Sequence, residues 1–201
     1  MADLITLQEY KDAKGISSPK LDDKLPFLIA AASQYIKNYI SLSLVDNINT
    51  PVVEYFDGTN TDRLLLTEFP LISIVSVGTS TDNAETFTTL DPTLYYTDEC
   101  LGAIYSVPTR FAMPCGNTKR SVRVEYLAGY GVEDVGNPGT YLENLPDDIK
   151  LATIELVAHY LKEDWTPRRS QRGSSEENVT VGSTLVVPIH IKRLLDIYRR
   201  L

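Results

Sequence analysis

Residues 145–165, LPDDIKLATIELVAHYLKEDW, contain the longest helical pattern in the chain. Pro146 ends the preceding loop, and Asp147 and Asp148 place negative charge where the first turn of a helix has unpaired N–H groups. Apolar residues then recur at helical spacing, so this helix has one apolar face. The residues of that face expected in the core are Ile149, Ala152, Leu156 and Tyr160. An apolar face of this length requires a partner.

A second helical pattern, at residues 22–42, supplies that partner. Pro26 is tolerated only in the first turn of a helix, so the helix is predicted to begin near Asp22 or Asp23. The alanines at 30–32 allow another helix to approach closely. Its expected packing residues are Leu28, Ile29, Ala32 and Ile36.

A short helix is predicted before it, at residues 6–15. Thr6 and Glu9 have the spacing of a capping box, in which each side chain satisfies a backbone N–H at the start of the helix. Gly15 is a natural C-terminal stop because glycine adopts the left-handed conformation without strain.

The helical periodicity disappears after about Asn47, and short β-type runs replace it up to Ala128. Asp57 and Gly58 predict a hairpin turn between the first two strands. The third strand has apolar residues on both faces and is expected to be buried on both sides, whereas the last alternates clearly, with Val122, Val124 and Tyr126 inward. Glycines from 129 to 139 predict a loop. The expected strands are 52–56, 63–67, 71–78, 86–90, 94–97, 102–107 and 121–127.

These patterns predict an α+β fold. The expected architecture is a helical bundle core, made of the N-terminal helices and the central helix, with an inserted small antiparallel β domain and a C-terminal helix. The expected domains are a helical core at 1–50 and 140–201, and the β domain at 51–130. The C-terminal helix is IHIKRLLDIYRRL at 189–201, and a β-like pattern at 179–188 precedes it.

Composition narrows the class of protein. The 201 residues, with 43% apolar and 23% charged side chains, are typical of an ordinary soluble protein with a real core. No apolar run approaches the roughly 20 residues that cross a bilayer, and the first ten residues do not resemble a secretory signal. Cys100 and Cys115 are too few and too far apart for a zinc site or a disulfide framework, which favours a reduced cytoplasmic setting.

Charge is unevenly distributed along the chain. Residues 1–165 hold 12 Lys and Arg against 24 Asp and Glu, whereas residues 166–201 hold 7 against 3. The body should therefore repel nucleic acid, and the basic tail could meet an acidic surface. The alternative is a solvated tail that carries charge only for solubility.

The sequence contains no recognisable catalytic motif, so no enzyme activity is predicted. His159 and His190 have no cysteine or carboxylate at metal-ligand spacing, so no metal site is predicted. The run from Asp57 to Asp62 resembles half of a calcium loop but lacks the later glutamate, and turn chemistry explains it. No phosphate-binding glycine motif occurs, so no nucleotide or other cofactor is expected.

The order of the motifs resembles the phage head–tail connector (adaptor) family. An opening helix with Thr6, Leu7, Glu9 and Tyr10 is followed by LIAAASQYIKNYI at 28–40. A β segment closes in VEYLAGY at 124–130, and LPDDIKLATIELVAHYL follows at 145–161. That family has a similar plan: a helical core, a variable β segment, and a turn that leads into a helix begun by Pro-Asp. The β insertion here, roughly 51–121, is longer than the shortest connectors need.

The resemblance implies a virion structural protein with no catalytic role. Connectors of this kind assemble as a ring, usually of twelve, beneath the portal, extend the DNA channel and receive tail-completion or stopper proteins. The implied partners are therefore other copies of the chain, the portal and a tail-completion protein, with DNA passing without specific binding and no membrane. The implied location is the virion neck, after assembly in the host cytoplasm.

The basic segment and the C-terminal helix are the candidates for docking to the portal or to a neighbouring copy. The basic side chains would meet acidic groups, and the apolar ones would fill grooves. Alternatives are that the helix folds back onto its own core, that the tail anchors a nucleic-acid-binding module, or that an enzyme site escapes detection. The candidate docking residues are Arg168, Arg169, Arg172, Lys192, Arg193, Leu194, Leu195, Tyr198, Arg199 and Arg200.

Overall fold

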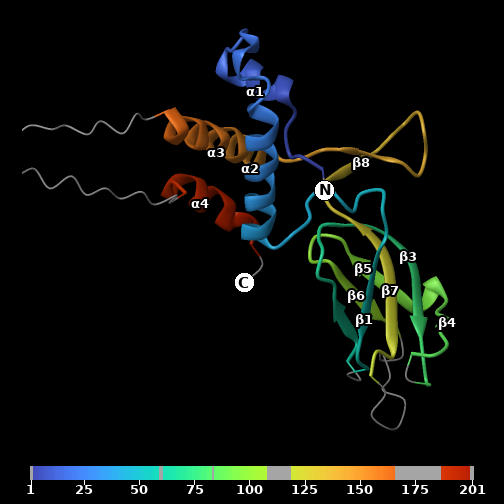
Figure 1. Ribbon diagram of the computed structural model, residues 1–201. Helices are drawn as coiled ribbons and strands as arrows, with labels where there is room; N and C mark the ends of the chain where they lie inside the picture. Colours follow the sequence, from blue (N-terminus) through green and yellow to red (C-terminus); the bar gives the residue numbers. More distant parts are fainter. Residues whose placement is uncertain (1, 59–60, 83, 108–118, 166–186, 200–201) are drawn as a thin grey trace, which may run out of the picture. The chain divides into compact units, whose positions relative to one another are not determined.

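The computed structural model describes residues 2–58, 61–82, 84–107, 119–165 and 187–199. The chain forms two compact units. One unit contains residues 3–40 and 147–201 and is helical; the other contains residues 1–2 and 41–146 and is built from strands. Helices and antiparallel sheets are thus segregated, which confirms the α+β class (Figure 1).

In the helical unit, α2 packs against α1, α3 and α4, and α3 also packs against α4. Figure 1 shows α2 running past both α3 and α4. No helix in the described part of the chain is both long enough and apolar enough to cross a membrane. The helical elements of this unit are α1 (Leu7–Lys14), η1 (Pro19–Leu21), α2 (Leu25–Ile40), α3 (Asp147–Trp165), α4 (Ile189–Leu195) and η3 (Asp196–Tyr198).

The ends of α1 confirm the prediction made from its sequence. The Thr6 hydroxyl accepts a hydrogen bond from the Glu9 N–H at 3.1 Å, and the Glu9 carboxylate accepts one from the Thr6 N–H at 2.7 Å. The bond from the Thr6 backbone is the main reason that the pKa of Glu9 lies below its ordinary value. Gly15 ends the helix in the left-handed conformation, with φ of 64°.

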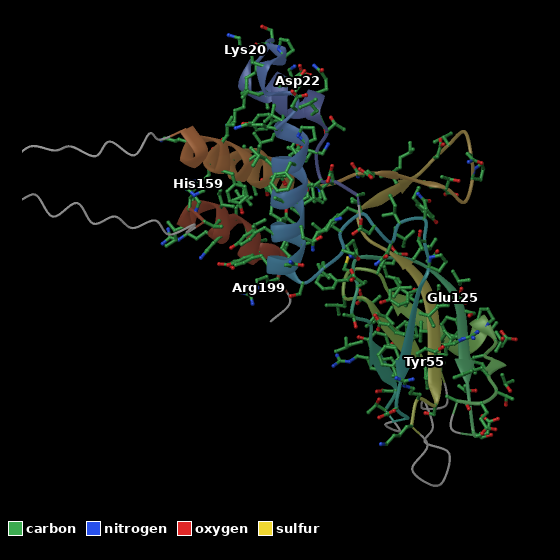
Figure 2. The ribbon with its side chains drawn as sticks, viewed as in Figure 1. Lys20, Asp22, Tyr55, Glu125, His159 and Arg199 are labelled. Carbon is green, nitrogen blue, oxygen red and sulfur yellow. The ribbon has the colours of Figure 1, made fainter. Side chains whose placement is uncertain are left out.

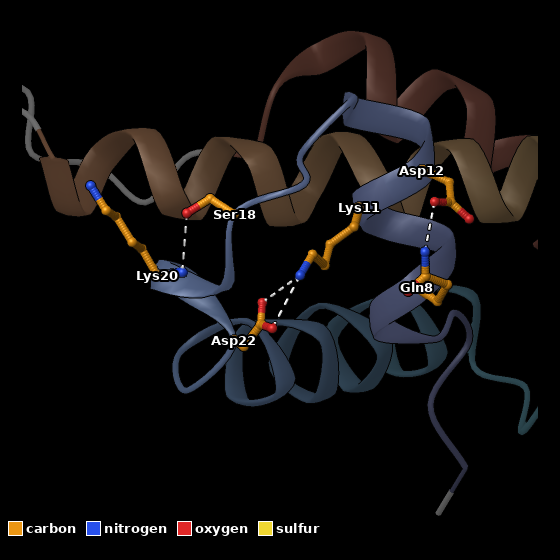
Figure 3. A network of polar contacts seen from close by, with 6 residues as sticks. All are labelled: Gln8, Lys11, Asp12, Ser18, Lys20 and Asp22. Atoms are coloured by element: carbon orange, nitrogen blue, oxygen red, sulfur yellow. Dashed lines mark hydrogen bonds and ion pairs between the residues drawn. The ribbon is translucent and has the colours of Figure 1, made fainter.

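The start of α2 differs from the prediction, because the helix begins at Leu25 rather than near Asp22 or Asp23. The preceding residues form the 3-10 turn η1, and Asp22 caps its end. The Lys11 ammonium group binds both carboxylate oxygens of Asp22, at 2.8 and 3.1 Å, so α1 holds Asp22 outside the helix (Figure 3). Pro26 lies in the first turn, as predicted.

The facing sides of α2 and α3 form the interior of the helical unit. Two polar groups in this interior are satisfied: Ser33 accepts the Leu4 N–H at 3.0 Å, and Thr153 donates to the Ile149 carbonyl at 2.8 Å. Leu28 and Tyr160 are half-buried, and burial raises the pKa of Tyr160. The fully buried packing residues expected from the sequence are Ile29, Ala32, Ile36, Ile149, Ala152 and Leu156.

The β unit contains two main antiparallel sheets and one hairpin, β8 (Gly131–Glu133) with β9 (Tyr141–Glu143). The larger sheet has the order β1-β7-β3-β4, and the smaller has the order β2-β6-β5. The 3-10 turn η2 (Pro92–Leu94) leads into β5. The strands of the two sheets are β1 (Val52–Phe56), β2 (Arg63–Leu65), β3 (Leu71–Thr79), β4 (Thr88–Thr89), β5 (Tyr95–Asp98), β6 (Ala103–Ser106) and β7 (Val122–Ala128).

One hydrophobic core is shared by the two sheets. β7 lies between β1 and β3 and turns Val122, Val124 and Tyr126 inward, as its alternation predicts. The smaller sheet contributes Ile104 from β6, and Leu64 comes from β2. Each sheet therefore covers the apolar face of the other.

Three expectations about this unit were wrong. β1 and β2 do not form a hairpin: β1 pairs with β7 and β2 with β6, and Asp57 instead accepts the Arg120 N–H at 2.7 Å next to β7. β3 is not buried on both sides, because two bulges interrupt its register with β7 and Val75 is 53% exposed. The expected loop at 129–139 contains β8 and the turn that leads to β9.

Candidate docking surface

The described residues contain no cluster of metal-ligating side chains. No group of three or more His, Cys, Asp and Glu side chains among them could hold a metal ion. His159 is half-buried on α3, His190 is exposed on α4, and Cys100 is exposed. Cys115 lies outside the described residues.

Two hollows also lack convergent chemistry. One, of about 330 Å³ in the helical unit, is lined by apolar side chains and by Lys162. The other, of about 510 Å³ in the β unit, holds the carboxylates of Asp46 and Glu143, and Asp46 already accepts the N–H of Ala2. Ser43 also lines the second hollow, where its hydroxyl accepts a hydrogen bond from the Asn47 side-chain amide. The candidate site is therefore a docking surface.

The C-terminal helix α4 is amphipathic, and its apolar side is buried in the helical unit. Pro188 is the N-cap, and because proline has no backbone N–H it leaves no donor unsatisfied there. Ile191 and Leu195, four residues apart on the same side of the helix, are buried in the unit. Val187, just before the helix, is also buried. Three buried apolar side chains therefore hold this short helix against α2 and α3.

Polar contacts fix the segment that follows α4. The Tyr39 hydroxyl on α2 donates to the Asp196 carboxylate at 2.7 Å, and this bond is the main reason that the pKa of Tyr39 is raised. The Arg199 guanidinium lies over the Tyr39 ring, 5.2 Å from its centre, and Figure 2 shows Arg199 beside the end of α2. Tyr35 stacks on Tyr39 with ring centres 6.1 Å apart.

Tyr198 connects the same segment to the start of α3. Its hydroxyl donates to the Asp148 carboxylate at 3.4 Å, a long hydrogen bond. Burial of the ring, followed by the charge of Asp148, raises the pKa of Tyr198. The C-terminal segment is therefore tied to both long helices of its own unit.

The sequence-predicted docking residues occupy different environments. Arg193 and Arg199 are exposed, Lys192, Leu194 and Tyr198 are half-buried, and Leu195 is fully buried. The helix thus folds back onto its own unit, which was the alternative considered from the sequence. Four further candidates lie outside the described residues: Arg168, Arg169, Arg172 and Arg200.

The outward side of this segment carries two exposed isoleucines that the sequence analysis did not single out. Ile189 is 68% exposed and Ile197 is 76% exposed, and the exposed Arg193 lies midway between them in sequence. We call these three residues the docking stripe. Their spacing of four residues was a usable pattern, but the buried series with Ile191 and Leu195 is equally periodic and drew attention to the other side of the helix.

Comparisons with known proteins give one consistent family. The model of the head completion protein family matches residues 3–201. The head completion protein of Escherichia phage T5 is 26% identical over 200 residues, covering 98% of this chain and 98% of that protein.

Three solved structures have a similar fold at 16% sequence identity, and each match covers 100% of this chain. A chain in the neck of an empty gene transfer agent (GTA) particle, computed with C6 symmetry, gives a TM-score of 0.61 over 93% of its length. A chain in the neck of the native particle, computed with C12 symmetry, gives 0.58 over 94%. A chain in the native GTA virion gives 0.60 over 95%. The likeness therefore includes the residues of both units.

Proposed function

Because the chain belongs to the head completion protein family and is a structural protein of the virion neck, where head and tail are joined, we propose that it acts there as a ring of identical copies bound beneath the portal protein. In this role it extends the DNA channel and receives a tail-completion or stopper protein on the other side. This role depends on binding surfaces, and no catalysed reaction is assigned to the chain.

The docking stripe is the observation that carries this proposal. Exposed isoleucines on either side of an arginine are the composition expected at a protein interface, where apolar anchors fill grooves and arginine pairs with acidic groups. The opposite side of α4 is already buried in the helical unit, so the stripe is presented on a supported element. We assign it to the contact with the portal.

The comparisons and the geometry of cyclic assemblies both support assembly of the chain as a ring. Two of the structures with a similar fold are necks computed with sixfold and twelvefold symmetry. In a ring of identical chains, each contact joins two different faces of the subunit, so one chain must carry two complementary surfaces. The two units give the chain room for separate portal-binding and neighbour-binding surfaces.

We further propose that the helices form the connector core, as a bundle, and that the β unit is an insertion into it. Helices α2 and α3, which flank the β unit in sequence, pack on each other, which supports this division. The acidic balance of the chain, 27 Asp and Glu against 19 Lys and Arg, suits a channel through which DNA passes without adhering.

Binding to purified portal rings tests the proposal. The wild-type chain should co-sediment with portal rings, and light scattering should give the mass of a ring of chains on a ring of portal. Ile189→Asp with Ile197→Asp should abolish this binding, and Arg193→Glu should weaken it at least tenfold, as expected for anchor residues at the centre of an interface. All three side chains are exposed, so the variants should keep the wild-type circular dichroism spectrum.

Lys20→Glu is the matched control, since Lys20 is an exposed basic residue of the same unit on η1. It should bind like the wild type. Failure of the wild-type chain to bind portal rings would contradict the proposed function, and normal binding by the stripe variants would contradict the assigned surface. Retention of the chain on DNA at moderate salt would favour the nucleic-acid-binding alternative.

A further inference from the structure

Two surfaces of the β unit are complementary in charge, and neither is used by the contacts described so far. The first is the β8–β9 hairpin. Asn49 holds it to the unit through two hydrogen bonds with the Tyr141 backbone, each 2.8 Å long, and Ile48 lies against Gly131 on the same side. The hairpin is thus anchored on one face.

The other face of the hairpin is exposed and apolar. Val132 and Leu142 are cross-strand partners, each about half exposed, and Val135 in the turn is 98% exposed. Glu133 and Glu143 alternate with Val132 and Leu142 along the strands, so they point to the anchored side, where Glu143 lines the hollow with Ile48 and Asn49. At the turn, Glu133 and Asp134 directly precede Val135, and residues 131–146 contain no lysine or arginine. The turn of the hairpin therefore presents an exposed apolar side chain beside two carboxylates, a combination that marks an interaction site.

The second surface is an arginine–aromatic patch on the outer face of the larger sheet, made of Tyr55, Phe87, Arg120 and Arg123. The Tyr55 and Phe87 rings lie 5.9 Å apart, and Tyr55 is 46% exposed. Arg120 lies over the Tyr55 ring at 5.6 Å, and Arg123 lies over the Phe87 ring at 5.2 Å. Figure 2 shows Tyr55 on β1 at the end of the sheet away from the hairpin.

Both guanidinium groups of the patch lack an acidic partner among the described residues. Neither arginine forms an ion pair there, and the Nε atom of Arg123 is buried without a hydrogen-bond partner. An unpaired arginine donor next to a ring is costly to bury unless an acceptor reaches it. Stacked arginine and tyrosine side chains are also the types enriched at the centres of protein interfaces.

The two surfaces cannot meet within one chain. Arg123 is near the start of β7, whereas β8 begins three residues after β7 ends at Ala128. Along a strand, the five steps from Arg123 to Ala128 span about 17 Å, so the hairpin and the patch lie at opposite ends of the larger sheet. An acidic, apolar surface at one end and a basic, aromatic surface at the other suit a head-to-tail contact between copies.

We propose that the turn of the β8–β9 hairpin of one copy docks on the arginine–aromatic patch of the next, with Val135 against the rings and the carboxylates of Glu133 and Asp134 near Arg120 and Arg123. This inference rests on the proposed ring and specifies its neighbour contact. The docking stripe remains free for the portal, so the two interfaces can be broken separately.

Two variants of the full chain, each with a control, test this contact. Arg120→Ala alters the patch, and Val135→Lys with Glu133→Lys alters the hairpin; all three side chains are exposed, so the fold should be retained. Arg63→Ala and Glu99→Lys are controls at exposed positions elsewhere in the unit. The patch variant and the hairpin variant should each raise the chain concentration needed for self-association, or for filling a portal ring, by tenfold or more. The controls should leave that concentration unchanged.

A mixture of the patch variant and the hairpin variant tests whether these two surfaces bind each other. The patch variant keeps its hairpin and the hairpin variant keeps its patch, so an equimolar mixture should form a dimer with one chain of each kind and no longer oligomer, as native mass spectrometry can show. Normal assembly by either variant on portal rings would overturn this contact and leave the proposed function intact. A wild-type chain that stays monomeric with and without portal rings would overturn both.

Discussion

Tyr126 shows what single residues contribute to this fold. The alternation of β7 predicts its inward direction, and the ring is fully buried in the core shared by the two sheets. Its hydroxyl donates to the Glu54 carboxylate on β1 and accepts the Glu68 N–H at 3.2 Å. Glu54 is also held by the Thr67 N–H. The pattern of the strand could not predict these partners, because they are 58 and 72 residues away in sequence.

Tyr126→Phe should therefore cost stability with little change in shape. The variant leaves the inward carboxylate of Glu54 with one donor fewer and the Glu68 N–H without its acceptor, which typically costs about 1–3 kcal/mol. Urea unfolding at pH 7 measures this difference. A variant as stable as the wild type would show that water replaces both hydrogen bonds.

The same pair of proteins should differ in its response to alkaline pH. Burial, followed by the hydrogen bond to Glu54, raises the pKa of Tyr126 above its ordinary value. A raised folded-state pKa stabilises the fold fully below the unfolded-state pKa, about 10, and this contribution is lost as the pH rises further. The advantage of the wild type over Tyr126→Phe should shrink by on the order of 1 kcal/mol per pH unit above pH 10. An advantage that stays constant between pH 9 and 11 would contradict this account.

Alanine substitutions at two glycines with positive φ distinguish the cost of backbone strain from the cost of steric overlap. Gly129 has φ of 124°, and an added Cβ would overlap the Leu44 carbonyl oxygen; Gly139 has φ of 85° and open space around it. Gly129→Ala should destabilise the chain by about 3 kcal/mol or more, and Gly139→Ala by about 1 kcal/mol. Thermal unfolding of both variants checks the order. Equal losses would mean that the segment around Leu44 can move aside.

At the scale of elements, the strands could be predicted better than their partners. Most expected strands agree with the structure within two residues, because alternation and turn residues are local properties. The pairing of β1 with β7 joins residues about 70 positions apart, and no local pattern specifies it. β8 and β9 have three residues each, beside glycines that indicate a loop, so they were missed.

The helix α1 depends on its caps more than on its packing. It has eight residues, and of these only Tyr10 is buried. Two ion pairs, Lys14–Glu155 at 2.7 Å and Lys150–Glu9 at 3.1 Å, also join it to α3, but half-exposed pairs of this kind contribute little. The capping box is therefore the main local determinant of the helix.

Thr6→Ala should destabilise α1 by about 1 kcal/mol, because it removes the acceptor for the Glu9 N–H. Amide hydrogen exchange in residues 7–14 should become about fivefold faster, with α2 unchanged. Ser17→Ala, at an exposed position after the helix, is the control and should leave both helices unaffected. Unchanged exchange in Thr6→Ala would mean that the ion pairs and Tyr10 hold the helix by themselves.

At the scale of the whole molecule, the candidate site was only partly accessible from sequence. The C-terminal helix and its exposed Arg193 were identified, yet Leu195 is buried in the helical unit. Periodicity states which residues share a side of a helix, but not which side faces the chain's own core. The hairpin and the arginine–aromatic patch were missed because they depend on strand pairing and on stacking between distant residues.

The two units each have a core of their own, so the β unit should fold without the helices. A fragment of residues 41–146 should unfold cooperatively in urea, and the whole chain should show two transitions, one of which matches the fragment. A shorter fragment, 51–130, is the matched control. It contains every strand of the two main sheets but lacks β8, β9 and the segment that provides the Leu44 carbonyl for the Tyr130 N–H at 2.8 Å.

The shorter fragment should be less stable than the longer one by several kcal/mol, because it lacks five buried apolar side chains. It also loses the bond between the Asn47 carbonyl and the Ala128 N–H at 3.2 Å. Equal stability of the two fragments would place the boundary of the β unit at 51 and 130, as the sequence pattern suggests. A longer fragment without a cooperative transition would mean that the strands need the helical unit in order to fold. The buried side chains that decide between these outcomes are Leu42, Leu44, Val45, Ile48 and Leu145.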